Sequence, residues 1–357
     1  MKKQFLACMC FPLIAFAQGR KYSNEFLNIG VDAHALGMSN ARVAGVNDVT
    51  AGFWNPAGLT QIGNAHHFAL MHANYFAGLA QYDYLSASMP VDALSTIAIS
   101  LVRFGVDDIP DTGELIDANG NIDYSRIKLF SAADYALFLS YARKIPAIKG
   151  LSLGANAKLI YRNVGRFANA YGFGFDIGAQ YKYQNWQFGA MLRDASSTFN
   201  LWLINQDEID NILDATGNSP VQNSLELTIP RLIIGAAHTL PIKNDFELKS
   251  ELNADFTFDG QRNTLVSANF GNIDPMLGLE FGYKKLAFIR AGLGNLSRET
   301  DFDGSRLWRF QPNLGLGFQF KGFALDYAFT DLGDQSTALY SHIFSLKYRL
   351  QRKSTLN

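Results

Sequence analysis

Long hydrophobic runs are missing from this chain, although hydrophobic residues make up 48% of its 357 residues. Beyond residue 17 no stretch of about 18 apolar residues occurs, and a membrane-spanning helix needs roughly 20. The sequence therefore excludes a helical membrane protein. A linker rich in proline and serine is missing too, so one structural domain is the simplest interpretation.

Clusters of one charge sign are also missing. The 31 lysines and arginines nearly balance the 32 aspartates and glutamates, which leaves a formal net charge of −1. Proteins that bind nucleic acids carry basic patches that neutralise phosphates, and this sequence has no such cluster. We therefore expect no nucleic acid among the partners.

Cysteine is almost absent. The two cysteines, Cys8 and Cys10, lie in a segment that has the pattern of a secretory signal peptide. Two lysines supply its basic start, residues 5–14 an apolar core, and residues 15–17 a small-x-small cleavage site. We expect residues 1–17 to be removed, which would leave the mature chain without a disulfide framework or a thiolate metal site.

The strongest positive signal is an alternation of apolar and polar residues over 245–258. Phe246 and Leu252 fall on one face and Lys249 and Glu251 on the other, because successive side chains of a strand point to opposite faces. At about 3.3 Å per residue and a tilt of about 45°, the run can cross a hydrocarbon core of roughly 30 Å. Soluble β-sandwiches also alternate, but their strands are typically about 5–6 residues long. The run therefore predicts a transmembrane β-barrel strand.

The same alternation recurs along the chain between turn signals. It predicts an all-β fold, a transmembrane antiparallel β-barrel of about 14 strands. The expected strands are 66–76, 81–89, 94–105, 134–144, 150–163, 168–183, 186–193, 225–239, 244–258, 274–284, 286–295, 306–320, 322–330 and 338–350. Residues 262–270 compete with 274–284 for one of these positions.

The connections between the expected strands sort by length. Even-numbered strands lead into short turns, and all the long connections, such as 106–133 and 194–224, follow odd-numbered strands. Outer-membrane barrels have an even strand count, short periplasmic turns and long external loops. We therefore expect an outer-membrane location in a Gram-negative bacterium, with both termini periplasmic. The barrel would cover residues 64–350 and a periplasmic tail residues 351–357.

Residues 18–63 precede the first expected strand and have a different texture. They are rich in small residues and glycine, and they carry apolar side chains such as Phe26, Leu36 and Trp54. A barrel of fourteen strands is wide enough to leave a lumen, and its inward polar groups need partners or water. We expect this segment to fold into the lumen as a plug rather than to form a loose tail.

The plug segment carries a family resemblance. Residues 32–41, followed by Asn47-Asp48 and by residues 54–59, resemble the start of PorV/PorQ family proteins, outer-membrane barrels of the Bacteroidota. These are related in fold to the FadL-like long-chain fatty-acid transporters, whose N-terminal hatch has a similar Asn-Pro-Ala step. The expected plug or hatch motif comprises Gly37, Met38, Asn40, Asn47, Asp48, Trp54, Asn55, Pro56, Ala57 and Gly58.

The resemblance implies a non-enzymatic function of one of two kinds. PorV- and PorQ-like members serve type IX secretion, in which the barrel binds secretion components or cargo proteins or holds the surface attachment machinery. FadL-like members pass hydrophobic small molecules through the barrel and out by a lateral opening. We expect the first role and keep the second as the alternative. Membrane lipids and lipopolysaccharide are the remaining expected partners.

The sequence offers little for catalysis or cofactor chemistry. No G-x-S-x-G occurs, and the six histidines are scattered, so we expect no catalytic residues. The glycines of 172–178 and 315–317 lie inside alternating strands rather than before helices, so they do not form nucleotide loops and instead make room on the lumen face. Loop 106–133 has several oxygen ligands but departs from a calcium loop. We expect no cofactor and no metal.

One expected external loop, 194–224, carries an unusual apolar set: Phe199, Leu201, Trp202, Leu203 and Ile204. Residues 206–214 follow with the spacing of a short amphipathic helix. The apolar set is a candidate contact for a ligand or a partner. Self-packing that stabilises a long loop is the alternative interpretation.

Overall fold

A computed structural model describes most of the chain, namely residues 23–75, 78–116, 120–209, 222–243, 245–300, 305–330 and 341–351. The expected signal peptide, residues 1–17, lies outside the described residues, and so does the expected tail beyond Gln351. Both therefore stay predictions.

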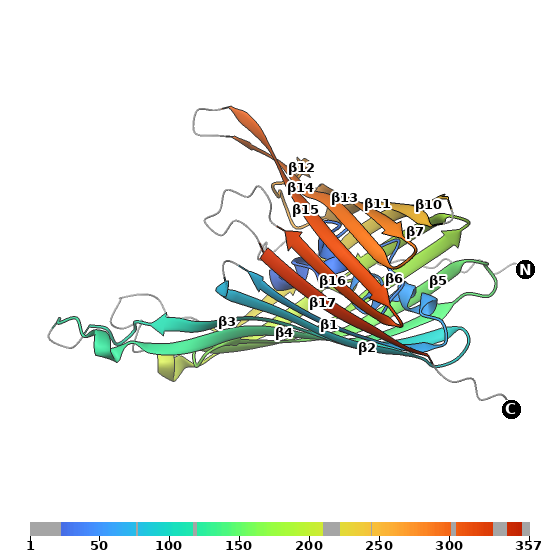
Figure 1. Ribbon diagram of the computed structural model, residues 1–357. Helices are drawn as coiled ribbons and strands as arrows, with labels where there is room; N and C mark the ends of the chain where they lie inside the picture. Colours follow the sequence, from blue (N-terminus) through green and yellow to red (C-terminus); the bar gives the residue numbers. More distant parts are fainter. Residues whose placement is uncertain are drawn as a thin grey trace, which may run out of the picture.

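Seventeen strands and a few short helices make up the described part (Figure 1). The strands are β1 Ala65–Tyr75, β2 Ala80–Pro90, β3 Ser95–Asp111, β4 Lys128–Lys144, β5 Leu151–Val164, β6 Ala168–Tyr183, β7 Trp186–Arg193, β8 Thr198–Ile204, β9 Ser224–Thr228, β10 Arg231–Ile242, β11 Phe246–Thr257, β12 Val266–Ala268, β13 Gly271–Tyr283, β14 Ala287–Thr300, β15 Arg306–Phe320, β16 Phe323–Thr330 and β17 Ser341–Gln351. The helices are η1 Glu25–Asn28, α1 Ala33–Leu36, α2 Ala51–Trp54, η2 Pro56–Gln61 and η4 Tyr124–Arg126.

The strands form one closed antiparallel β-barrel. Sequential neighbours pair around the ring, β7 pairs with β10 and β11 with β13, and β1 pairs with β17 to close it. Three short strands (β8, β9 and β12) are additions to the ring, so fourteen of the seventeen described strands form it. This confirms the expected fold class.

The expected strands have counterparts, and the differences lie at the ends that carry the long connections. β3 and β4 each run for 17 residues, so much of the expected loop 106–133 continues the sheet beyond the barrel (Figure 1). The expected strand 225–239 is divided into β9 and β10 around Ile229 and Pro230, because proline has no N–H to donate to a ladder. The expected loop 194–224 contains β8, and residues 262–270 supply only the short β12.

The two ends of the barrel differ as the sorting of connections predicts. Ala65 at the start of β1 pairs with Gln351 at the end of β17, so the ring begins and finishes at one end. The turns at 184–185, 284–286 and 321–322 lie at this same end, which we call the short-turn end. The opposite, long-connection end carries the extensions of β3, β4, β8 and β9 (Figure 1).

The outward face of the barrel is apolar. On β11, Leu252 is 56% exposed while its neighbours Glu251 and Asn253 are buried in the lumen, as the alternation predicts. Exposed aromatic rings gather near the short-turn end: Tyr183, Trp186, Phe246, Tyr283, Phe320 and Phe323. An apolar band edged by aromatic rings is typical of a barrel surrounded by lipid.

Among the described residues, no helix is long and apolar enough to cross a membrane.

Residues 23–64, which we call the lumenal segment, lie inside the ring (Figure 1). Nearly all of their side chains are buried, and hydrogen bonds join them to inward side chains of strands far away in the sequence, such as Ser345 and Glu251. Its short helices are single turns, so contacts with the barrel wall hold this segment rather than helix propensity.

Candidate functional site in the barrel lumen

The lumen has an apolar half and a charged half. The inward faces of β1 to β4 present Met71, Tyr82, Tyr84 and Phe138 to the lumenal segment, and Phe53 packs among them. Its ring centroid lies 5.2 Å from that of Trp54, 6.4 Å from Tyr84 and 5.7 Å from Phe138, all edge-on. Aromatic rings prefer this geometry, so the contacts fix the segment against this half of the wall.

Asn55 and Pro56 attach the centre of the lumenal segment to the wall. The fully buried Asn55 donates from Nδ2 to the carbonyl oxygens of Val43, at 2.9 Å, and of Ala179 on β6, at 3.0 Å. Its Oδ1 accepts from the N–H of Ala57, and Pro56 begins η2, where a missing donor costs nothing. One amide thus joins two parts of the segment to the barrel.

Glycines on the inward face let the segment approach the wall closely. A Cβ on Gly154 would lie 2.5 Å from the backbone of Pro56, and one on Gly189 only 2.3 Å from the carbonyl oxygen of Val43. Gly178 meets Asn55 in the same way, and Gly315 meets Gly37. Of the glycines expected to make room on the lumen face, Gly178 and Gly315 thus meet the segment. Gly172, Gly174 and Gly317 instead face side chains of the barrel, namely Asn200, Thr198 and Arg290.

The remaining motif residues divide between packing and surface positions. Met38 packs against Gly278, and the Nδ2 of Asn40 donates to the carbonyl oxygen of Ile29 at 3.2 Å. The indole N–H of Trp54 donates to the carbonyl oxygen of Val31 at 3.0 Å. Asn47, in contrast, is exposed. The motif is therefore a set of contacts between segment and wall.

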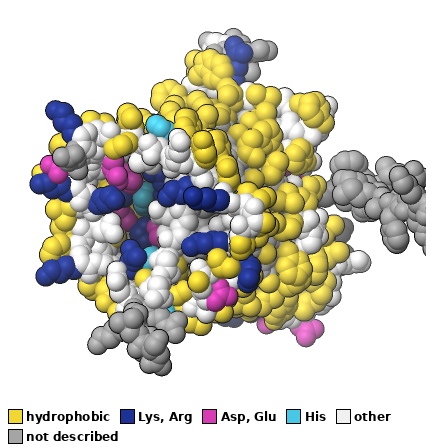
Figure 2. All heavy atoms as spheres, turned by 90° about the vertical axis from the view of Figure 1, so that its right-hand side faces the viewer, with side chains coloured by type: hydrophobic (Ala, Val, Ile, Leu, Met, Phe, Trp, Pro, Cys, Tyr) yellow, Lys and Arg dark blue, Asp and Glu magenta, His cyan; other side chains and the backbone are white. Residues whose placement is uncertain are grey.

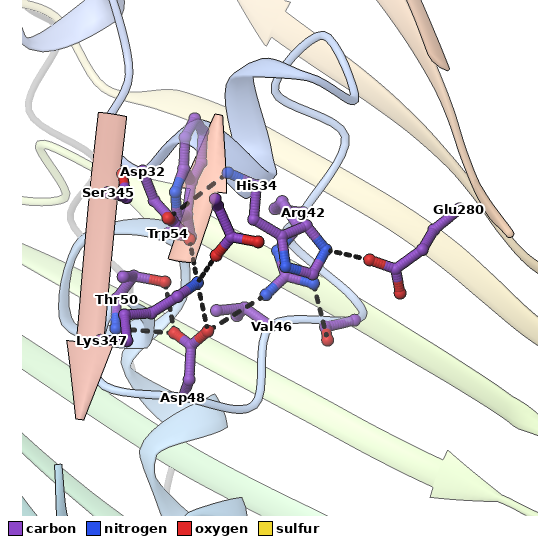
Figure 3. A network of polar contacts seen from close by, with 12 residues as sticks. Asp32, His34, Arg42, Val46, Asp48, Thr50, Trp54, Glu280, Ser345 and Lys347 are labelled. Carbon is purple, nitrogen blue, oxygen red and sulfur yellow. Dashed lines mark hydrogen bonds and ion pairs between the residues drawn. The ribbon is translucent and has the colours of Figure 1, made fainter. Parts of the chain in front are cut away.

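Lys347 on β17 is the centre of an ion-pair network that holds the lumenal segment to the charged half (Figure 3). Its Nζ lies 2.7 Å from Asp32 and 3.2 Å from Asp48, both in the segment, and 3.2 Å from Asp326 on β16. Burial opposes ionisation of Asp48, but the nearby Lys347 and Arg42 more than offset this and lower its pKa. One buried ammonium therefore joins three carboxylates.

Neighbouring charges continue this network. Arg290 on β14 contacts Glu280 at 2.6 Å and Asp326 at 2.7 Å. The Nε2 of His34 lies 2.9 Å from Glu280 (Figure 3). Burial and the cations Arg290 and Arg42 lower the pKa of His34 to about 3. The imidazole is therefore neutral at pH 7, and its contact with Glu280 is not an ion pair there.

The barrel wall is interrupted between β6 and β7. The ladder runs from Tyr183 to Ile177 of β6 against β7, stops, and resumes at Phe173 against β8. Residues 174–176 therefore have no ladder partner on this side, while residues 193–198 of the neighbouring strand form a bulge. One backbone hydrogen bond, from Ala195 N–H to the carbonyl oxygen of Phe175 at 2.8 Å, crosses the interruption.

A buried charge cluster closes this interruption from inside. Lys158 on β5 contacts Asp176 on β6 at 2.8 Å and also Asp194 in the bulge, and its side chain is 2% exposed. Thr198 donates its hydroxyl to Asp194, and Asn156 joins Asp176 to the carbonyl oxygen of Gly52. The cluster thus connects the wall, the bulge and the lumenal segment.

Three cavities adjoin these contacts. A small one of about 40 Å³ lies inside the wall interruption, between Phe53, Phe138, Lys158 and Asp194. One of about 390 Å³ lies on the long-connection side of the segment, where Leu36 and Asn40 line it. One of about 500 Å³ lies on the short-turn side. The segment therefore separates two polar spaces.

The apolar set Phe199 to Ile204 is a strand rather than a packed loop, which corrects the sequence prediction. β8 alternates, so Phe199, Leu201 and Leu203 are 41–46% exposed on the outer face of the barrel. Trp202 is on the opposite face, where its N–H donates to Glu226 at 2.6 Å and Arg162 stacks on its ring. Residues 206–209 are helical as expected, and 210–214 lie outside the described residues.

The described parts of the acidic loop and the histidines add no metal-binding cluster. Parts of loop 106–133, including Asp117 and Asn119, lie outside the described residues. Within the described ranges, no group of three or more His, Cys, Asp or Glu is placed to hold a metal ion.

Sequence reasoning missed the residues that matter at the wall interruption. The alternation of β5 and β6 places Lys158 and Asp176 on their inward faces, but nothing in it shows that Asp194 joins them. The available signal is the stretch 194–197 after a strand, in which three of the four residues, Asp194, Ser196 and Ser197, are turn-forming types. In the structure Asp194 and Ser197 have positive φ.

Comparison with known proteins identifies the fold. No family model matches the chain, and no curated protein does so by sequence. Solved structures do match: the toluene transporter TbuX of Ralstonia pickettii has a TM-score of 0.55 at 11% identity, covering 90% of this chain and 98% of that one. The P. putida toluene transporter TodX scores 0.54 at 13% identity, covering 90% and 99%. The monoaromatic hydrocarbon channel CymD scores 0.51 at 13%, covering 91% and 98%.

The chain therefore shares the barrel fold of these transporters. The likeness extends over nearly the whole length of each of these transporters. At 11–13% identity it does not transfer a substrate, and it does not single out PorV/PorQ proteins.

Proposed function

We propose that this protein is an outer-membrane channel for hydrophobic small molecules. The main support is the interruption of the wall between β6 and β7. Residues 174–176 have no ladder partner on this side, and a cavity lies directly inside. A β-barrel wall is otherwise a continuous hydrogen-bonded surface. The fold shared with hydrocarbon transporters supports the same function.

The surroundings of the interruption suit an apolar solute. On the inside it adjoins the rings of Phe53 and Phe138, and on the outside Phe175 and Phe199 are 43% exposed. A hydrophobic molecule that passes here leaves aromatic surroundings in the lumen and enters lipid without crossing water. In this proposal the Lys158 cluster keeps the opening closed at rest.

The test is to close the interruption with a disulfide bond. Cysteines at Phe175 and Ala195, whose backbones are hydrogen-bonded, would form a disulfide across it. The readout is the uptake rate of the hydrophobic fluorescent probe phenylnaphthylamine by cells that express the barrel. We expect oxidation to reduce uptake to the rate of cells without the barrel, and reduction to restore it.

The matched control places a disulfide bond in an intact part of the same wall. Ile177 and Leu192 are directly paired on β6 and β7, so their cysteine pair links the same strands where the ladder is continuous. Uptake through this variant should not depend on oxidation. Equal uptake by the oxidised Phe175/Ala195 variant and the unmodified barrel would overturn the proposed route.

A second candidate, a partner-binding role linked to type IX secretion, is supported by a different observation. The lumenal segment fills the centre of the barrel, and charged pairs such as Arg290 with Glu280 occupy much of the rest. A filled, polar lumen suits a scaffold that binds proteins. Affinity isolation from native membranes tests this role, and recovery without any secretion component would exclude it.

A further inference from the structure

The short-turn end of the barrel opens into a cavity of about 500 Å³. The lumenal segment forms its floor with Arg42, Asp48 and Val49, and inward side chains at the ends of the strands form its walls. Lysine and arginine side chains gather over this end of the molecule, with acidic and histidine side chains between them (Figure 2). The cavity is therefore separate from the wall interruption, which lies beyond the segment.

Positive charge exceeds negative charge in this cavity. Seven lysines and arginines line it, against four acidic residues: Asp48, Glu247, Glu280 and Asp326. The chain as a whole carries a net charge of −1, so the local excess is not a consequence of a basic protein. Walls of low dielectric around a cleft of one sign concentrate its field, which attracts ions of the opposite sign.

Four of the seven cations have no carboxylate within 4.0 Å among the described residues. Lys182, Lys285 and Arg349 are exposed at the rim, and they make no side-chain hydrogen bond there. The fourth, Lys249, is buried and donates only to the carbonyl oxygen of Gly45, at 2.9 Å. The excess charge is therefore available to a ligand.

Arg42 at the floor is the most incompletely paired of the buried cations. The residue is 1% exposed, and its Nε is buried without a hydrogen-bond partner among the described residues. Its other nitrogens make only long contacts, 3.5 Å to the carbonyl oxygen of Gly45 and 3.6 Å to Asp48. A buried guanidinium normally makes several short, charge-assisted hydrogen bonds. Its remaining capacity suits the oxygens of an anion.

We propose that this cavity binds a small multivalent oxyanion, one that carries phosphate or carboxylate groups. Such an anion would accept hydrogen bonds from Arg42 and Lys249 at the floor, while Lys182, Lys285 and Arg349 neutralise its outer charges. A cavity of about 500 Å³ has the size of a small-molecule site. The same groups occur on acidic side chains of proteins, so the experiment separates the two sources.

The test is calorimetric titration of the purified full-length barrel, in neutral detergent and at low salt, with pyrophosphate as the probe. We expect saturable binding with a Kd below about 1 mM, weakened by added salt because exposed charges are screened. The variant K182Q/K285Q/R349Q removes the three rim cations without touching the floor. We expect its Kd for pyrophosphate to rise about tenfold.

The control variant K149Q/K243Q/K321Q removes three exposed lysines from turns at the same end that do not line the cavity. Its Kd should stay within about twofold of the unmodified value. Absence of saturable binding to the unmodified barrel, or an equal loss in both triple variants, overturns the proposal. Hexaglutamate peptide forms the second arm: tighter binding of the peptide than of pyrophosphate would overturn the assignment to a small free anion.

Discussion

Lys158 on β5 lies 2.8 Å from Asp176 on β6, at the height where β6 loses its ladder partner. The β5–β6 ladder is intact at this height, so the link across the interruption is the contact of the same ammonium with Asp194 in the bulge. A side-chain link can be broken without unfolding a strand, which is what an opening in the wall requires. The pair also contacts Asp194, so it ties the bulge to the continuous sheet.

Replacing Lys158 by methionine tests this link. The substitution leaves Asp176 and Asp194 buried without a cation, and removing one partner from a buried ion pair typically costs about 3–5 kcal/mol. We expect faster hydrogen exchange in residues 174–176 and 194–198 and faster uptake of phenylnaphthylamine.

Two comparisons make the Lys158 experiment specific. Lys149 precedes β5 in an exposed turn, so Lys149→Met should change neither readout. The triple variant K158M/D176N/D194N removes all three charges and should regain much of the lost stability. Unchanged exchange in the single variant would show that the cluster does not close the wall.

The lumenal segment approaches β7 so closely at Gly189 that a side chain there would displace it. A valine there would place its Cβ 2.3 Å from the carbonyl oxygen of Val43, far closer than van der Waals contact, so the segment has to move. We expect Gly189→Val to displace the segment and raise the single-channel conductance of the barrel in planar bilayers.

The adjacent Ala190 faces outward and provides the control. Ala190→Val adds the same methyl groups on the lipid side of the same strand, and its conductance should match that of the unmodified barrel. If both variants conduct equally, the close contact at Gly189 does not hold the segment.

The strands could be predicted from the sequence because one face of each strand contacts lipid. A wall between lipid and a polar lumen enforces alternation at every residue, as Leu252 between Glu251 and Asn253 illustrates. The positions of the turns could be predicted as well, because a strand that crosses a bilayer has a minimum length. Asn55 and Pro56 of the expected plug motif lie where the lumenal segment meets the wall, but Asn55 has an ordinary extended backbone, so its hydrogen bonds rather than its local conformation matter there.

The site could not be predicted to the same degree. β7 and β8 both alternate correctly, and the alternation does not show that their ladders against β6 are out of register. The same limit explains why Phe199 to Leu203 were interpreted as a loop cluster. Which inward charges meet also depends on the register of strands far apart in sequence, as for Lys347 with Asp32.

Truncation of two asparagines of the plug motif should have unequal effects on stability. Asn55 is fully buried and donates to two carbonyl oxygens that would lose their partner, whereas Asn47 is exposed. Leaving buried polar groups unpaired costs about 1–3 kcal/mol, so we expect Asn55→Ala to destabilise the folded barrel by about this amount. Asn47→Ala should stay within about 0.5 kcal/mol of the unmodified protein. Urea unfolding in detergent measures both, and equal effects would contradict the assigned role of Asn55.

The buried His34 leads us to expect that acid weakens docking, by which we mean the attachment of the lumenal segment to the barrel wall. Burial and the facing cations Arg290 and Arg42 lower its pKa to about 3, while Glu280 acts in the opposite direction. The undocked imidazole has a pKa of about 6.5, so it binds a proton that the docked one does not. The contribution of neutral His34 to the free energy of docking is then fully present above about pH 6.5 and decreases as the pH falls toward 3. Between pH 7.5 and 4.5 the loss attributable to His34 amounts to about 2–3 kcal/mol.

The measurement follows the fluorescence of Trp54, which packs within the segment, during urea titration of a barrel whose other tryptophans are phenylalanine. We expect the midpoint of the Trp54 transition to fall between pH 7.5 and 4.5. In His34→Gln the titrating group is gone, so its midpoint should change much less over the same interval. Acidic groups such as Asp48 are present in both proteins, and the difference between the two pH profiles therefore isolates the imidazole. Identical profiles would mean that His34 does not couple protonation to docking.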